Sequence, residues 1–232
     1  MAALSKRMLM NVTLMPPGGR VADIGCDHAM VPIYLVREGL ADYVIAMDVN
    51  EGPLDIARGN IKKAHLEDKI ELRLSDGAEA LKLIDGRSEC ETILIAGMGG
   101  HLALGIIERE LDKFKGPSVV LQVQSDIEYV RGRLDELSFV IEDEDMTMDA
   151  GKYYFAMRIR YDEAKAHTLS CLDKKYGPKL IQKGHALLPQ YLMWEKAKYE
   201  KILKNVDGDT KSRIIEEIGD IDKLLGRMYG KS

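Results

Sequence analysis

The chain has 232 residues, 46% of them hydrophobic, and its formal net charge is −5. This length suits one domain of ~160 residues with an appendage, because domains typically span about 100–200 residues. The N-terminal segment lacks the uninterrupted apolar stretch of a signal peptide and no run reaches membrane-spanning length, so we expect no membrane partner. Cys26, Cys90 and Cys171 are odd in number and lack metal-type spacing, which favours reduced thiols in the cytoplasm and no bound metal.

The first motif is VADIGCDHA at residues 21–29, a short apolar strand that runs into a glycine-containing turn. The next predicted strand, within IAMDVN at 45–50, ends on Asp48. In doubly wound α/β domains the first turn approaches a ligand closely, and the acid after the next strand binds a ribose diol. A dinucleotide enzyme would have three glycines in this turn. Here Asp27 and Ala29 replace the second and third, which opposes a nicotinamide-dependent oxidoreductase.

An acidic residue in this turn repels phosphate but suits a ligand with a cationic amino-acid end. S-adenosylmethionine is such a ligand, because it has adenine and ribose, no phosphate, an ammonium and a sulfonium. The motif therefore predicts a methyl-donor pocket that includes Asp23, Gly25 and Asp48. The alternatives are a chance match in an ordinary α/β turn and, for Asp48, a surface carboxylate at a strand end.

Strands and helices continue to alternate up to residue 161. A helix over 52–64 precedes a strand at 70–74, and further strands are predicted at 92–96, 118–123 and 153–161. This alternation indicates parallel βαβ units with helices on both faces of the sheet. Because ligands bind at the carboxyl ends of such strands, we expect one crevice to collect Asp23, Gly25, Asp48, Asp76 and the turn at 96–100. The acidic run at 142–145 is predicted to be a solvated face or loop.

The charges divide the chain into two domains. Residues 1–162 hold 19 Lys/Arg and 28 Asp/Glu, whereas residues 163–232 hold 14 and 10. We therefore expect a catalytic domain over 1–162 and a basic C-terminal domain over 163–232. The basic domain is consistent with a polyanionic partner, and a solvated lysine-rich face is the alternative.

The C-terminal domain is predicted to be an antiparallel helical pair. Apolar residues recur at helical spacing from Ile214 to Met228, and a second apolar series runs from Leu188 to Val206. A short polar turn separates the two series, as in antiparallel neighbours. Pro189 fits only near a helix start. Trp194 is expected in the core of this pair, with an exposed stacking surface as the alternative.

Several motifs together resemble the bacterial tRNA (adenine-22-N1)-methyltransferase family. They are LSKRM at 4–8, ADIGCDHA, DVNEGP, IAGMGG, the GK-Y pattern at 151–154, YGPKL and LLPQYL. The resemblance implies an α/β, Rossmann-like class I methyltransferase fold with a C-terminal antiparallel, coiled-coil-like helical appendage. It also implies methylation of N1 of an adenine in the D-arm of tRNA, with S-adenosylmethionine as the donor.

The resemblance also implies site residues. The cofactor-binding residues would be Asp23, Gly25, Cys26, Asp27, His28, Asp48, Val49, Asn50, Asp76, Gly77, Ala96, Gly97 and Met98. The substrate-binding residues would be Gly99, Gly100, Gln122, Gln124, Lys152, Tyr154, Lys196, Lys198, Lys201 and Lys204. Asp27 and Arg7 would be catalytic. For Asp27, binding the methionine ammonium or orienting His28 is the alternative role.

The chain departs from the family at the end of the fifth strand, where Gln122-Val123-Gln124 replaces the usual Gln-Pro-Asn. Gln124 then holds the target base with a longer side chain, or the substrate differs. Asp48 replaces a usual glutamate, and both acids can bond a ribose diol. Two other hypotheses remain open: a methyltransferase for a small molecule or protein, with the helical pair serving dimerisation, and a non-catalytic adaptor. We expect a monomer, with a dimer as the alternative.

Overall fold

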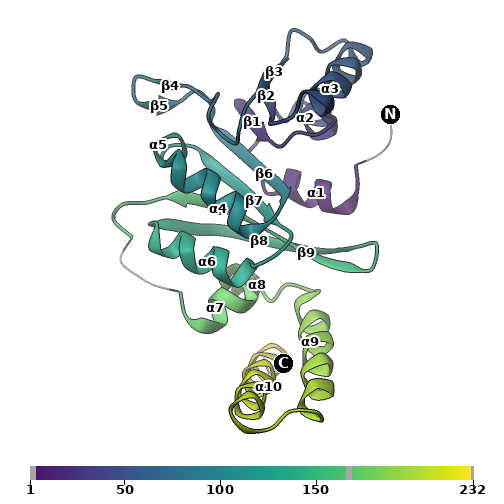
Figure 1. Cartoon of the computed structure of the whole chain (residues 1–232), viewed down its shortest axis with the longest axis vertical. Helices are drawn as coiled ribbons and strands as arrows, with labels where there is room; N and C mark the ends of the chain where they lie inside the picture. The colour runs from purple at the N-terminus through teal and green to yellow at the C-terminus, as the bar shows by residue number, and fades with distance from the viewer. Residues whose placement is uncertain (1–3, 166–168, 231–232) are drawn as a thin grey trace.

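The computed structural model describes residues 4–165 and 169–230, and its centre is a seven-stranded sheet with the order β3-β2-β1-β6-β7-β9-β8 (Figure 1). The strands of this sheet are β1 Arg20–Ile24, β2 Tyr43–Asp48, β3 Ile70–Leu74, β6 Thr92–Met98, β7 Ser118–Val123, β8 Phe139–Asp149 and β9 Lys152–Tyr161. A separate two-stranded ribbon consists of β4 Leu83–Ile84 and β5 Arg87–Ser88.

The position of β1 in this sheet determines where a ligand can bind. β1 pairs in parallel with β2 on one side and with β6 on the other, and the parallel set extends to β3 and β7. The chain proceeds outward from β1 to β3, then returns to place β6 on the opposite side. The order of strands therefore reverses between β1 and β6, and a crevice opens at their carboxyl ends at such a switch point.

Helices cover both faces of the sheet, as the sequence predicts (Figure 1). On one face, the core that includes Ile33, Val44 and Ile61 joins the sheet to α1 Lys6–Thr13, α2 Met30–Arg37 and α3 Glu51–Ala64. On the other face, the core that includes Ile95 and Phe114 joins it to α4 Gly100–Arg109, α5 Leu111–Phe114 and α6 Ile127–Glu136. Among the described residues, no helix is long and apolar enough to cross a membrane.

The prediction of a solvated face or loop at 142–145 is wrong, because these residues belong to β8 at the edge of the sheet and one of them, Glu144, is buried. Glu144 is fully buried and accepts hydrogen bonds from Nε of Arg131, at 2.8 Å, and from the backbone N–H of Lys179, at 2.9 Å. Arg131 lies on α6 and is itself buried. A buried carboxylate is tolerated when it is paired and hydrogen-bonded, and such a distant partner leaves no mark on the local sequence pattern.

The C-terminal region consists of helices and packs beneath β8 and β9 (Figure 1). Its elements are α7 Cys171–Tyr176, α8 Pro178–Lys183, α9 Leu188–Leu203 and α10 Gly208–Tyr229. α9 and α10 form the predicted pair, with Leu192 and Ile221 in its core, and Pro189 lies in the first turn of α9. The predicted core position of Trp194 is wrong, because 48% of this residue is exposed.

Candidate active site

The turn after β1 has three residues with positive φ, as in a glycine-rich loop, but only the first of them is glycine. Gly25, Asp27 and Ala29 have φ angles of 79°, 50° and 57°. Glycine adopts positive φ readily, whereas a residue with a Cβ atom is strained there. The second and third fingerprint positions therefore keep the expected conformation although they carry side chains. Such strain at a strand-to-helix turn is a feature of functional sites.

Asp48 ends β2 and is oriented by the backbone on both sides of it. One carboxylate oxygen accepts a hydrogen bond from the N–H of Asp27, at 3.3 Å, and the other accepts one from the N–H of Asn50, at 3.0 Å. Each carboxylate oxygen can accept a further hydrogen bond. This arrangement suits the recognition of two neighbouring hydroxyl groups, as the sequence motif predicts.

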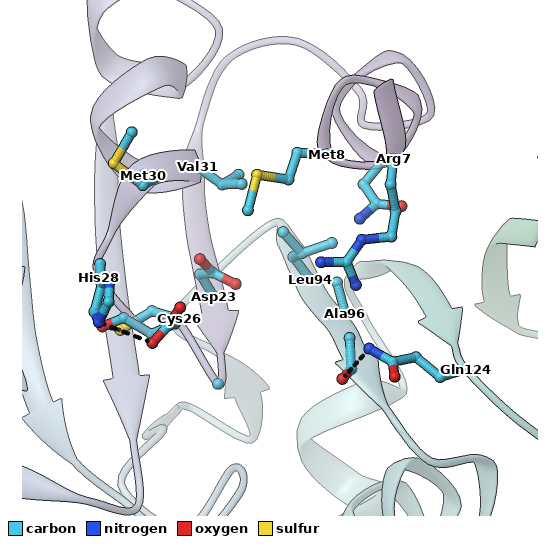
Figure 2. Close-up of a pocket in the computed structure, with 14 residues that line it drawn as sticks. Arg7, Met8, Asp23, Cys26, His28, Met30, Val31, Leu94, Ala96 and Gln124 are labelled. Carbon is cyan, nitrogen blue, oxygen red and sulfur yellow. Dashed lines mark hydrogen bonds and ion pairs between the residues drawn. The ribbon is translucent and has the colours of Figure 1, made fainter. Parts of the chain in front are cut away.

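A cavity of about 250 Å³ opens between this turn and α1 (Figure 2). Figure 2 shows Cys26 and His28 on one side, Arg7 and Gln124 on the other, and Asp23 between the two groups. The cavity thus brings together the predicted site residues Arg7, Asp23, Gly25, Cys26, Asp27, His28, Ala96, Gly97 and Gln124.

Two buried hydrogen-bond acceptors in the cavity wall lack donors. Asp23 is 4% exposed, and no donor in the described part of the chain is paired with its carboxylate. Burial, and then the charge of Asp48, raises the pKa of Asp23 to about 7. Asn11, on α1, is 2% exposed, and its Oδ1 has no hydrogen-bond partner among the described residues. Buried acceptors of this kind require donors, so the wall fits a ligand with an ammonium group.

The opposite wall is built around Arg7. Its Nη1 donates to Oε1 of Gln122, at 3.3 Å, and its guanidinium carbon lies 5.5 Å from the centroid of the Tyr154 ring. Gln122 is fully buried and does not line the cavity, so it acts on the site by holding Arg7 through this hydrogen bond. Gln124 is exposed, and its Nε2 donates to the carbonyl oxygen of Gly97, at 2.8 Å. The polar groups on this side are therefore held over the turn that follows β6.

Other predicted site residues lie outside this cavity. The carboxylate of Asp76 is exposed and forms an ion pair with Arg109, at 3.2 Å. Val49 is exposed after β2, and Met98, Gly99 and Gly100 form the end of β6 and the start of α4. Lys152 and Tyr154 line a second cavity of about 330 Å³, and Gln124 lines both cavities. The predicted lysines from 196 to 204 belong to α9 and the turn after it (Figure 1).

Two residues of this site were not found from the sequence. Asn11 is polar within the apolar segment MLMNV, and a buried polar residue in such a helix is a usable signal. Asp149, at the end of β8, accepts a hydrogen bond from the backbone N–H of Arg7, at 3.3 Å. No local signal indicates this contact, because it depends on the missed strand β8.

The thiol of Cys26, which lines the cavity, is a poor nucleophile. Burial and the nearby carboxylates raise the pKa of Cys26 far above its usual value, so the thiolate is scarce at neutral pH. Within residues 4–165 and 169–230, no group of three His, Cys, Asp or Glu residues could hold a metal ion.

Comparison with known proteins identifies the family. A family model described as TrmK, tRNA (adenine(22)-N(1))-methyltransferase, matches residues 21–224. The chain belongs to the TrmK family. It is 30% identical over 231 residues to the tRNA (adenine(22)-N(1))-methyltransferase of Bacillus subtilis strain 168. The aligned residues cover 96% of this chain and 95% of the relative. The activity of the chain is therefore methylation of N1 of adenine 22 in tRNA, and the small-molecule, protein and adaptor hypotheses are set aside.

Solved structures of similar proteins contain the methyl donor or its product. Streptococcus pneumoniae Sp1610 in complex with S-adenosyl-L-methionine has a TM-score of 0.85 and 30% identity, covering 96% of this chain and 100% of its own. M. capricolum TrmK in complex with S-adenosyl-homocysteine has a TM-score of 0.83 and 26% identity, covering 98% and 100%. These similarities confirm the predicted methyltransferase fold with its C-terminal helical pair.

Proposed function

We propose that the cavity between the β1 turn and α1 binds S-adenosylmethionine and that the TrmK reaction takes place on its Arg7–Gln124 side. The observation that carries this proposal is the pair of buried acceptors without donors, Asp23 and Asn11, at the switch point of the sheet. These acceptors would bind the methionine ammonium. Asp48 would bind the ribose diol, and small residues at 96–97 allow close approach to the ligand.

The remaining cofactor contacts are proposed from the family resemblance. Asp76 would accept a hydrogen bond from the amine of the donor's adenine, beside Gly77, and the segment from Val49 to Asn50 would lie along the ribose. Asp76 is now paired with Arg109 on the surface, so a rotation of its side chain would be part of binding.

The bound donor supplies a methyl group on a sulfonium, which is already activated for transfer. Catalysis by this chain is then mainly alignment of the target nitrogen. Arg7 and Gln124 would hold the adenine, and Gln122 would keep Arg7 in place. Adenine N1 has a lone pair and needs no base before attack, but the methylated ring is cationic. Asp27, an exposed carboxylate at the cavity mouth, would stabilise that charge or accept a proton from the amine.

The C-terminal domain, residues 163–232, would bind the tRNA. N1 lies on the Watson–Crick edge, so the base must be unpaired or flipped, at a cost of about a few kcal/mol. Contacts between phosphates and exposed lysines such as Lys201 and Lys204 would offset this cost. One chain carries both the cavity and the basic helices, so we propose that the protein acts as a monomer. We also propose that it acts in the cytoplasm, where free thiols such as those of Cys26 and Cys90 stay reduced.

The test is to incubate the protein with radiolabelled S-adenosylmethionine and an unmodified tRNA, and then to identify the labelled nucleoside. A tRNA in which adenine 22 is replaced by guanine is the matched control. We expect labelled 1-methyladenosine from the first tRNA and no label in the second. Label in another nucleoside, or equal labelling of both tRNAs, would overturn the proposed target and would implicate Gln124 in a different specificity.

A further inference from the structure

The end of the β8–β9 hairpin lies between α1 and α9 (Figure 1), and residues of α1 line the reaction cavity. The second cavity, of about 330 Å³, is formed here by Tyr153, Tyr154 and Lys152 together with the segment after β7. Gln124 forms part of the wall of both cavities. The two cavities are therefore adjacent.

Tyr153 and Tyr154 connect these cavities to different parts of the molecule. Successive side chains of a strand point to opposite faces of the sheet. Tyr154 accordingly packs with α1 beside Arg7, whereas Tyr153 packs with the aromatic residues of α9. Its ring centroid lies 5.2 Å from that of Tyr191 and 5.6 Å from that of Trp194.

Trp194 forms the exposed end of this aromatic cluster. Its ring is 5.8 Å from Tyr191, and yet 48% of the residue is in contact with solvent. Nζ of Lys198, one turn further along α9, lies 4.4 Å from the Trp194 ring centroid. An indole fixed on one side by other rings, open to solvent and accompanied by a cation on a flexible side chain is the arrangement that binds unpaired bases: the base stacks on the ring and the cation contacts the adjacent phosphate.

We propose that Trp194 and Tyr153 form a stacking site for an unpaired nucleobase of the tRNA, next to the adenine that is methylated. Lys198 and Lys152, both exposed, would contact the phosphates on either side of this base. The site rests on the proposed function, because it takes its ligand from the same tRNA. It holds the substrate close to the point where the target base leaves the helical stack, and it needs no particular base identity, since every base has a π-face.

The chain contains one tryptophan, so its intrinsic fluorescence reports on this site directly. The first measurement is a titration of the wild-type protein with unmodified tRNA, followed by quenching with acrylamide. We expect saturable quenching by tRNA and protection of Trp194 from acrylamide, and no comparable change with S-adenosylhomocysteine alone. Unchanged fluorescence and accessibility at saturating tRNA would overturn the proposal, even if every variant failed to fold.

The second measurement is kinetic. Trp194→Leu keeps apolar volume and removes the π-face, so we expect the KM for tRNA to rise about tenfold, with kcat and donor affinity unchanged, because one stacked base contributes about 1–3 kcal/mol. Trp194→Phe should stay within about threefold of wild type. Met193→Ala changes the neighbouring exposed residue on α9 and should have no effect.

The outcomes separate this inference from the proposed function. If the wild-type protein methylates tRNA and Trp194→Leu has an unchanged KM, the stacking site is wrong and the function stands. If the wild-type protein transfers no methyl group to tRNA, the proposed function itself has failed. Loss of thermal stability and of donor binding in both Trp194 variants would assign Trp194 a structural role and would overturn the stacking site. The stacking site would also be overturned if sedimentation and fluorescence measurements showed that Trp194 is buried in a protein dimer.

Discussion

The charge of Asp23 depends on its burial and on its neighbour Asp48. Burial, and then the charge of the neighbouring Asp48, raises the pKa of Asp23 to about 7. Part of the Asp23 population is therefore protonated near neutral pH. A bound ammonium group would favour its ionised form. The unfavourable charge of Asp23 is therefore relieved either by a proton or by a cationic ligand.

We predict that donor affinity depends on pH through Asp23. Affinity should rise from pH 5.5 to 7 as Asp23 loses its proton, and should fall above about pH 8 as an α-amino group loses its own. Asp23→Asn should bind the donor more weakly and lose the rise below pH 7. Isothermal titration across this pH range measures both effects, and an unchanged acid limb in the variant would contradict the assignment.

The stability of the ligand-free protein supplies the control. The pKa of Asp23 is higher in the folded protein than its ordinary value of 3.8, so its ionisation destabilises the fold. The penalty is absent below about pH 4, grows up to about pH 7 and is constant above that. Asp23→Asn should therefore unfold at a higher urea concentration than wild type at pH 8, and at nearly the same concentration at pH 4.

Asp27 has two candidate roles, stabilisation of the methylated product and binding of the donor. Its side chain is exposed and lies 3.4 Å from Nε2 of His28. If Asp27 stabilises the cationic product, Asp27→Asn should lower kcat about 100-fold and change donor affinity less than about threefold. Single-turnover rates and donor titration measure the two quantities separately. A weaker donor affinity with an unchanged rate would instead assign Asp27 to donor binding.

One buried ion pair, between Arg131 and Glu144, joins the catalytic sheet to the C-terminal helices. Arg131 donates to the carbonyl oxygens of Lys174 and Lys175 at the end of α7, each at 3.0 Å. Glu144 accepts a hydrogen bond from the backbone N–H of Lys179 at the start of α8. Gly177, between these helices, has a φ of 86°, and a Cβ atom there would lie 2.7 Å from Oε2 of Glu144. The junction therefore requires glycine on two separate grounds.

We predict that Gly177→Ala destabilises the protein by about 2 kcal/mol or more, because it adds backbone strain and displaces a buried ion pair. Gly184→Ala is the matched control: Gly184 also has positive φ, at 59°, but an added Cβ would meet nothing within 4 Å. Strain alone should cost about 1 kcal/mol there. Urea unfolding of both variants measures the difference, and equal losses would show that the ion pair plays no part.

The same junction explains which elements the sequence could predict. Strands such as β3 and β7 are short apolar segments bounded by turn residues, and their predicted bounds are confirmed. β8 escaped prediction because Glu144 is acidic and its compensating partner, Arg131, lies on another element. In the site, turn residues such as Gly25 could be located because their role is local. Gln122 and Asn11 could not be assigned correctly, because burial and unsatisfied atoms depend on tertiary packing.

The charge of the protein is divided between an acidic body and basic C-terminal helices, as the sequence indicates. Part of that basic charge is already engaged. Lys196 lies 2.6 Å from Asp222 of α10, and Lys198, beside Trp194, belongs to the proposed stacking site. Lys201 and Lys204 are exposed toward the turn between α9 and α10. These two lysines are therefore the better candidates for long-range attraction of tRNA.

We predict that the double variant Lys201→Gln/Lys204→Gln raises the KM for tRNA and lowers the salt dependence of binding, by roughly one unit of slope for each phosphate that is no longer neutralised. Thermal stability and donor binding should not change, because both side chains are exposed. Lys62→Gln, on α3 of the acidic body, is the control and should behave as wild type. Filter binding at several salt concentrations measures the slope, and an unaltered slope would place tRNA elsewhere on the protein.

The alternation along β9 also limits how this enzyme can change in evolution. Tyr154 belongs to the packing beside α1, and Tyr153 to the packing beside α9. The insertion or deletion of one residue directly after Tyr154 would exchange the two rings between faces and would misplace both at once, because the rest of β9 stays paired with β7 and β8. Residues added before Lys152 only lengthen the turn at Ala150-Gly151, and most exposed hairpin tips tolerate such changes. A library of insertions selected for activity should therefore contain longer turns but no change of residue count on the sheet side of Tyr154.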